Sequence, residues 1–203
     1  SVVEDQFRES KGGYAVIPLV VRSHFSMMRG TASVRELVRA AKKMGYDALA
    51  LTDTDNLYGL WPFINECKRE GIKPIIGAEL TETSGADRAV CLVENAQGYK
   101  NLCRLISARH CDASFNLERE LVSKGGSLIV LTSDARLLAA LHYSGLSVYA
   151  AMPRNPGGCP EFARKVAARL KVPLAAVPGS FFPRPRDYKL HRLLRAIDLN
   201  TSL

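Results

Sequence analysis

Polar residues that could form a catalytic site follow several short apolar runs of the chain. In parallel α/β proteins the functional groups gather where strands end, so these residues are the first candidates for a site. They are one imidazole and three carboxylates: His24, Asp53, Glu79 and Asp134. A hydrolase that uses two or three metal ions needs several His and Asp ligands that converge in this way. The chain has only four histidines, however, and only His24 follows such a run, which disfavours a site for two or three metal ions.

Each candidate also has a structural role open to it. His24 could be a leftover ligand or phosphate contact, or it could simply pack or meet solvent. Asp53, between two threonines, could be catalytic or could serve as a cap or turn residue. Glu79 could bind a metal or form a structural salt bridge. The residue types alone leave these alternatives open.

Short apolar runs alternate with amphipathic stretches along most of the chain. The expected strands are 14–21, 47–52, 72–76, 89–93, 127–132, 146–151 and 173–177. The expected helices are 33–44, 57–70, 98–108, 117–123, 135–141, 160–170 and 187–197, with Asp134 and Asp187 as N-caps. This alternation predicts an α/β fold in which helices cover a parallel sheet, arranged as a compact barrel or a wound sheet. Residues 1–13 are expected to form an N-terminal extension and 14–203 a single domain.

Composition narrows the class of protein further. Apolar residues make up 47% of the 203 residues, which excludes a disordered chain. Lys and Arg number 28 against 20 Asp and Glu, and the net charge of +8 favours polyanionic partners, nucleic acid first. The five cysteines form no CxxC pair, which indicates reduced thiols and a cytoplasmic location. We expect no membrane span and no secretory signal. The ending after a basic helix predicts a segment of a longer protein.

Five blocks in order carry a resemblance to a known family. They are Ser23–Gly30, Ala50–Gly59, Gly71–Glu79, Gly98–Ile106 with Ser127–Thr132, and Asp187–Ile197. These blocks resemble the PHP domain, more narrowly the one that opens the alpha subunit of bacterial C-family DNA polymerase III. The wording Ser-His-Phe-Ser and Asp-Asn-Leu-Tyr-Gly favours the error-prone, translesion branch. The resemblance implies a PHP-type distorted (β/α)7 barrel with mostly parallel strands.

Active members of that family hold up to three metal ions and hydrolyse phosphoesters. The resemblance places their nine ligand positions on Val20, Arg22, Arg29, Thr54, Glu79, Arg88, Asp134, Gly179 and Phe181. Of these, Glu79 keeps the family's carboxylate and Asp134 is a conservative replacement. Three positions carry arginine, whose permanent positive charge repels metal ions. The resemblance therefore implies a degenerate metal site with no catalytic and no metal-binding residue.

Two hypotheses follow for the arginines. Arg22, Arg29 and Arg88 could stand in for the missing metal charge and pair with Glu79, Asp134 or Asp53 as a buried polar network. Alternatively, they could bind a phosphate group, because the arginine fork matches phosphate geometry. Lys189 and Arg192, which share a helical face, could contact DNA or be merely solvated.

The resemblance implies a structural and docking domain of an error-prone DNA polymerase that acts in DNA replication, repair and translesion synthesis. The parent polymerase would be a nucleotidyltransferase that uses Mg²⁺, whereas this domain would need no cofactor and would not be catalytic. Expected partners are the rest of the polymerase chain, DNA, and a proofreading exonuclease or translesion accessory proteins. The alternatives are a divergent metal-dependent phosphoesterase using Glu79, Asp134 and Asp53, or a stand-alone binding module with the same fold.

Overall fold

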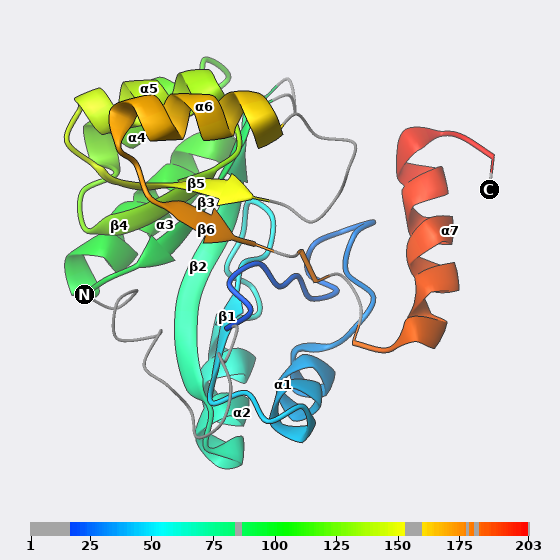
Figure 1. Ribbon diagram of the computed structural model, residues 1–203. Helices are drawn as coiled ribbons and strands as arrows, with labels where there is room; N and C mark the ends of the chain where they lie inside the picture. Colours follow the sequence, from blue (N-terminus) through cyan, green and yellow to red (C-terminus); the bar gives the residue numbers. More distant parts are fainter. Residues whose placement is uncertain (1–16, 84–86, 153–159, 178, 181–182, 203) are drawn as a thin grey trace.

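The computed structural model describes residues 17–83, 87–152, 160–177, 179–180 and 183–202 (Figure 1). Its six strands are β1 (Ala48–Leu51), β2 (Lys73–Thr81), β3 (Arg88–Val93), β4 (Leu128–Thr132), β5 (Ser147–Met152) and β6 (Leu174–Ala176). Its helices are α1 (Val34–Lys43), α2 (Leu60–Glu70), α3 (Ala96–Cys111), α4 (Leu117–Lys124), α5 (Ala135–Tyr143), α6 (Pro160–Leu170), the short η2 (Pro185–Asp187) and α7 (Tyr188–Leu199). The strands lie side by side in chain order and form a curled half-barrel sheet. The expected α/β class is confirmed.

The sheet is mostly, but not wholly, parallel. Neighbouring strands are parallel between β1 and β2 and from β4 to β6, whereas β3 is antiparallel to both β2 and β4. Only a short connection joins β2 to β3, and a parallel pair would need a long crossover there. The strict alternation expected from the sequence is therefore wrong at β3. Strand β2 also continues to Thr81, beyond the expected end at Ile76.

The first expected strand is replaced by an irregular segment. Residues 14–16 lie outside the described residues, and Val21 forms only an isolated parallel bridge with Ser180. The amide of Arg22 donates to the Ser180 carbonyl at 3.1 Å, and the amide of Ser180 donates to the Val20 carbonyl at 2.8 Å. On its other side the segment meets β1, where the amide of Thr52 donates to Val21. We call this contact between 20–22 and Ser180 the closing seam, because it joins the two edges of the curled sheet.

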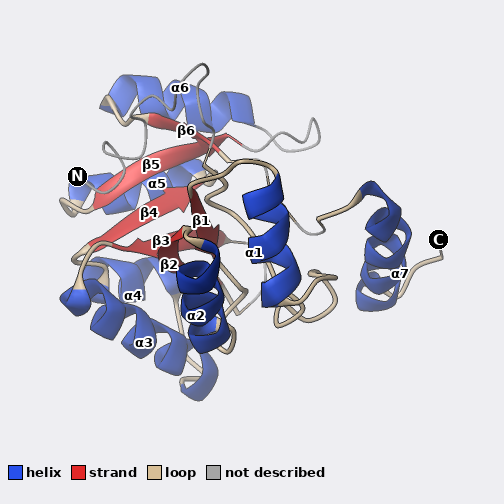
Figure 2. Ribbon diagram, turned by 90° about the horizontal axis from the view of Figure 1, so that it is seen from below, coloured by secondary structure: helices blue, strands red, loops and turns tan. Residues whose placement is uncertain are grey.

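Both faces of the sheet are buried, as the continuous apolar strands predicted. In β4 the side chains of Leu128 and Val130 pack in the cluster beneath the outer helices. The alternate residues Ile129 and Leu131 belong to a second cluster inside the curl of the sheet. This alternation follows from the two-residue period of a strand. Figure 2 shows α1 to α6 arranged around the outside of the strands.

The helix ends follow local sequence signals. Ser33 and Glu36 form a capping box at α1, and Asp134 accepts the amide of Leu137 as the N-cap of α5, as expected. Asp187 stands at the N-cap of α7, but its side chain makes no capping bond there. Its carboxylate lies 3.6 Å from Arg184 Nε instead, so the expected cap is wrong.

Helix α7 differs from the other helices. None of its residues is buried, and it stands apart from the sheet in Figure 1.

Cys67, Cys91, Cys103 and Cys111 are free thiols, and Cys159 lies outside the described residues. Among the described helices, none combines the length and apolar character that crossing a bilayer requires.

Candidate functional site

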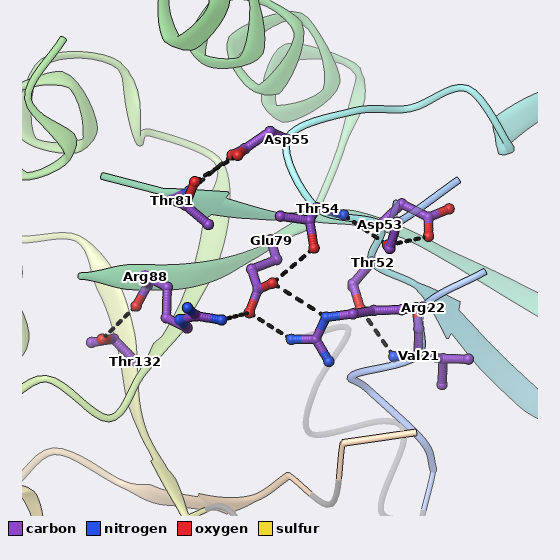
Figure 3. A network of polar contacts seen from close by, with 11 residues as sticks. Val21, Arg22, Thr52, Asp53, Thr54, Asp55, Glu79, Thr81, Arg88 and Thr132 are labelled. Carbon is purple, nitrogen blue, oxygen red and sulfur yellow. Dashed lines mark hydrogen bonds and ion pairs between the residues drawn. The ribbon is translucent and has the colours of Figure 1, made fainter. Parts of the chain in front are cut away.

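The candidate site lies at the edge of the sheet where β1 and β2 end. Thr54, which follows β1, forms a parallel bridge with Glu79 of β2. Arg88 opens β3, which reaches the same edge because it runs in the opposite direction. The side chain of Arg22 extends from the closing seam toward Glu79. Figure 3 shows Arg22, Thr54 and Arg88 converging on Glu79 from different segments.

Glu79 is the centre of the cluster. Its side chain is only 2% exposed, and Arg22 contacts both of its oxygens, Nη2 to Oε1 at 2.5 Å and Nε to Oε2 at 3.2 Å. The hydroxyl of Thr54 donates to Oε2 at 2.9 Å, and Arg88 Nη1 lies 3.6 Å from Oε1. Burial alone would raise the pKa of Glu79, but Arg22, Arg88 and Thr54 outweigh it and hold the pKa below its ordinary value. The carboxylate is therefore ionised and engaged on both oxygens.

The described hydrogen bonds of the Asp53 carboxylate are with a neighbouring turn and not with the arginines. Its buried carboxylate accepts hydrogen bonds from the amide of Ser23 at 2.7 Å, the hydroxyl of Ser23 at 2.7 Å and the hydroxyl of Ser26 at 2.6 Å. The Ser26 hydroxyl in turn accepts the amide of Thr54 at 3.0 Å. The arrangement ties the segment after the closing seam to the end of β1. The expectation that Asp53 shares the arginine network is not met by any described ion pair.

Asp134 also has another role. Its carboxylate accepts the Leu137 amide at 2.7 Å as the cap of α5, and no ion pair with an arginine is found for it in the described part of the chain. A bond to an amide three residues away needs almost no chain ordering beyond the helix itself, so the cap is favoured over a distant partner. Among the described ion pairs, those of Arg22 and Arg88 are formed with Glu79 and not with Asp53 or Asp134.

Arg29 lies in a compact turn, where its amide donates to the Ser26 carbonyl at 3.0 Å. Gly30 leaves no room for a side chain, since a Cβ there would lie 1.9 Å from the Ser23 carbonyl oxygen. His191 of α7 contacts the Arg29 carbonyl through Nδ1 at 2.8 Å. Burial lowers the pKa of Arg29 and the positive charge of Arg88 lowers it further, while the charge of Glu79 acts in the opposite direction.

The remaining expected positions are spread around the site. Val20 is buried in the core inside the sheet, Gly179 is exposed and Phe181 lies outside the described residues. Lys189 and Arg192 are exposed on α7. His24 is exposed and its ring lies 4.3 Å from that of Phe25. None of these residues contacts Glu79 in a described bond.

The residues present do not suit a cluster of metal ions. The carboxylate of Glu79 already carries a bidentate guanidinium, and a second guanidinium lies within ion-pair distance. A divalent ion would have to displace or approach these fixed positive charges. Within the described ranges, no group of three or more His, Cys, Asp or Glu side chains is arranged to hold a metal.

Sequence reasoning missed several polar partners. Ser23 and Ser26 hold Asp53, and only their spacing after an apolar run could have suggested it. Asp55 has a positive φ of 55°, and its carboxylate accepts both the amide and the hydroxyl of Thr81. His110 Nε2 contacts the Asp55 carbonyl at 2.7 Å. These contacts brace the ends of β1 and β2 around the site.

Comparison with known proteins places the fold and site in context. The PHP domain family matches residues 18–171. The chain is 35% identical over 145 residues to the DNA polymerase III subunit alpha of Chlamydia pneumoniae, covering 60% of this chain and 12% of that protein. It is 40% identical over 94 residues to the error-prone DNA polymerase of Anaeromyxobacter sp. strain K, covering 44% and 8%. The chain thus spans only about a tenth of the length of these relatives.

Solved structures agree on the fold. A candidate metal-dependent phosphoesterase from Bifidobacterium adolescentis superimposes with a TM-score of 0.58 at 14% identity, covering 83% of this chain and 87% of that one. At this level of identity the likeness concerns the fold alone. It supports the α/β architecture described above.

Proposed function

The chain belongs to the PHP domain family, and from this premise we propose that it is a non-catalytic domain of a DNA polymerase III alpha-like, error-prone polymerase. In this role it supports the polymerase module structurally and offers a docking surface for DNA or a partner protein, such as a proofreading exonuclease or a translesion accessory protein. Polymerisation itself would take place elsewhere in the longer protein, with Mg²⁺.

The arginine pairing of Glu79 carries the non-catalytic part of this proposal. A phosphoesterase of this kind needs its carboxylates free to bind metal ions. Here Glu79 is buried and bonded to Arg22, and Asp53 and Asp134 hold a turn and a helix. These contacts support the view that the side chains now stabilise the fold and no longer bind metal.

The relatives support the polymerase part. The matched proteins bear the names of a polymerase III alpha subunit and an error-prone polymerase, and both exceed this chain greatly in length. In the first, 145 aligned residues are 12% of the whole, which corresponds to 145/0.12, or about 1,200 residues. The proposal therefore expects the natural protein to be of this size.

A divergent metal-dependent phosphoesterase is the second candidate, favoured by the likeness to the Bifidobacterium structure. Titration calorimetry with Mn²⁺ and Zn²⁺ at neutral pH separates the two. Our proposal expects no saturable heat and no metal-stimulated cleavage of a model phosphodiester. Stoichiometric binding accompanied by turnover, lost in Glu79→Gln, would favour the phosphoesterase.

The polymerase context needs its own measurement. An antibody raised against this chain should detect a protein of about 1,200 residues in cell extracts, and immunoprecipitates should extend a primed DNA template. Detection of a species of only about 203 residues that extends no primer would contradict the polymerase context and favour the stand-alone module.

A further inference from the structure

An open pocket of about 650 Å³ lies on the surface of α3, away from the cluster around Glu79. Helices α3 and α4 lie side by side over one core cluster (Figure 2). Five lining residues come from α3 and one from the last turn of α4: Tyr99, Lys100, Cys103, Arg104, Ser107 and Lys124. The α3 residues recur at intervals of three and four positions and therefore share one face of the helix. We call this feature the α3 pocket.

The α3 pocket is held in shape without a ligand. Leu105, on the opposite face of α3, is fully buried. The side-chain amide of Asn101 donates to the Gly126 carbonyl at 2.8 Å and ties α3 to the loop after α4. A Cβ at Gly98 would lie 2.0 Å from the Ser127 carbonyl oxygen, so α3 packs there directly on the backbone that leads into β4. A site fixed in advance reduces the entropy lost on binding.

Cations dominate the wall of the α3 pocket. Lys100 and Arg104 are both exposed and are four positions apart. Helix α3 contains no Asp or Glu, and within the described ranges neither cation has an ion pair. Like charges four positions apart on a helix repel each other, and an anion bound between them would relieve that repulsion. Lys124 adds a third cation, which is paired with Glu120. The pocket is therefore suited to an anionic ligand.

Tyr99 adds an aromatic surface beside these charges. It is 38% exposed and directly precedes Lys100 in the chain. Cations next to an accessible ring suit single-stranded nucleic acid, because a base stacks on the ring while the phosphates meet the cations. In a duplex the bases stack on one another and cannot use the ring. An acidic protein segment would use the cations but would leave the ring without a stacking partner.

We propose that the α3 pocket binds single-stranded DNA, with one base stacked on Tyr99 and the adjacent phosphates bound by Lys100 and Arg104. The naming of DNA as the nucleic acid rests on the proposed function, of which this pocket would be the DNA-docking surface. The hydroxyl of Ser107 supplies a further hydrogen-bond donor on the same wall. The net charge of +8 agrees with a polyanionic ligand.

The first test compares two forms of DNA on the 203-residue chain. Fluorescence anisotropy measures the binding of a labelled oligothymidylate at low salt, in EDTA so that no metal mediates binding. The same strand is then annealed to its complement. The single strand should bind at least about fivefold more tightly, because only it offers a base to Tyr99. Undetectable binding, or equal binding of both forms, would overturn the proposal.

Variants of the ring test the stacking. Tyr99→Leu should weaken binding of the single strand by about fivefold or more, whereas Tyr99→Phe, which keeps the ring, should retain it. Tyr143→Leu, at another exposed tyrosine, is the matched control and should leave the affinity unchanged. Circular dichroism checks that each variant is folded. Equal affinities of folded Tyr99→Leu and Tyr143→Leu would refute the site.

Variants of the cations test the phosphate contacts. The logarithm of the association constant falls linearly with the logarithm of the salt concentration, and each lost phosphate contact should lessen the slope by about 0.7. Lys100→Gln and Arg104→Gln should each show this change. Arg164→Gln, at an exposed arginine of α6, should keep the original slope. The same change in all three variants would indicate an unspecific basic surface and contradict the assignment.

A competitor tests the other kind of occupant. Polyglutamate should displace the labelled strand much less effectively than unlabelled oligothymidylate does at the same concentration of negative charge. Equal displacement would indicate an acidic protein segment and overturn the proposal. Failure of the proposed function is read separately, from immunoprecipitates that extend no primer. Immunoprecipitates that extend a primer, together with a Tyr99→Leu chain that binds DNA normally, would refute the α3 pocket alone.

Discussion

Arg22 and Glu79 are 57 positions apart in the chain, yet the guanidinium of Arg22 donates hydrogen bonds to both carboxylate oxygens of Glu79. Both side chains are almost fully buried. Each charge is expensive to bury alone and tolerable only with its partner. This pair therefore joins the closing seam to β2, and it makes stability depend on two residues far apart in the chain.

Removing one partner should destabilise the fold strongly. Glu79→Ala leaves the buried guanidinium of Arg22 without its main counterion, and we expect the free energy of unfolding to fall by about 3–5 kcal/mol in urea denaturation. Glu161→Ala on α6 breaks the exposed pair with Lys165 and should cost under about 1 kcal/mol. The double variant Arg22→Met/Glu79→Leu should recover much of the loss. Similar small effects at Glu79 and Glu161 would refute the buried pair.

The same pair should make stability depend on pH. Because the folded-state pKa of Glu79 is lowered, its contribution is fully present above the ordinary carboxyl pKa of about 4.3. The contribution is lost as the pH falls from there through the lowered folded-state pKa. The difference in unfolding free energy between the wild type and Glu79→Gln should therefore be large at pH 7 and shrink below about pH 4. A difference that stays constant over this range would argue against an ionised Glu79.

The turn that carries Arg29 should tolerate no side chain at Gly30. In Gly30→Ala the new Cβ would meet the backbone carbonyl of Ser23, which cannot move without disturbing the bonds to Asp53. We expect a loss of about 1–3 kcal/mol in thermal or urea unfolding. Gly126→Ala is the control, since a Cβ there would meet nothing within 4 Å. Equal stability of the two variants would show that the turn adapts.

The cysteines should separate into slow and fast thiols. Burial raises the pKa of Cys91 to about 12, and burial together with the charge of Glu66 raises that of Cys67 to about 12. Cys111 is exposed. In a Cys103→Ser/Cys159→Ser background, Ellman's reagent at pH 8 should react quickly with Cys111 and very slowly with the two buried thiols, because the thiolate is the reactive form.

Substitution identifies each phase of that reaction. Cys111→Ser should remove the fast phase, whereas Cys91→Ser should leave it unchanged. A fast phase that persists in Cys111→Ser and disappears in Cys91→Ser would mean that the core opens readily around β3.

Sequence patterns predicted the positions of helices and strands better than the directions in which the strands run. Helix α6 begins and ends where the apolar spacing and Pro160 indicated, and α1 begins directly after Ser33, where the helical spacing starts. The direction of β3 could not be read in the same way, because an apolar run in a strand is the same in either orientation. It depends on the short connection from β2, whose length became visible only once β2 was seen to continue to Thr81.

The ion pair at the site was predictable from residue types, whereas the choice among carboxylates was not. A buried carboxylate among arginines implied an ion pair, and Glu79 has one with Arg22. For Asp53 the sequence left arginine pairing and a turn role open, and in the structure Ser23 and Ser26 supply three short hydrogen bonds to it. Which donors reach a carboxylate depends on side-chain direction in the folded chain, which residue spacing does not specify.

The closing seam also has a kinetic consequence. Val21 and Ser180 lie near opposite ends of the described chain, so their contact closes a very long loop, whereas each pair of neighbouring strands closes a shorter one. Long-range contacts form late in folding, and a seam that few backbone bonds of the described residues hold opens at a lower free energy than the central strands. The curled sheet should therefore open transiently at the closing seam. Hydrogen exchange at the amides of Arg22 and Ser180 would be faster than exchange at β4. The two edges of the sheet would separate at the closing seam while the other strands remain paired.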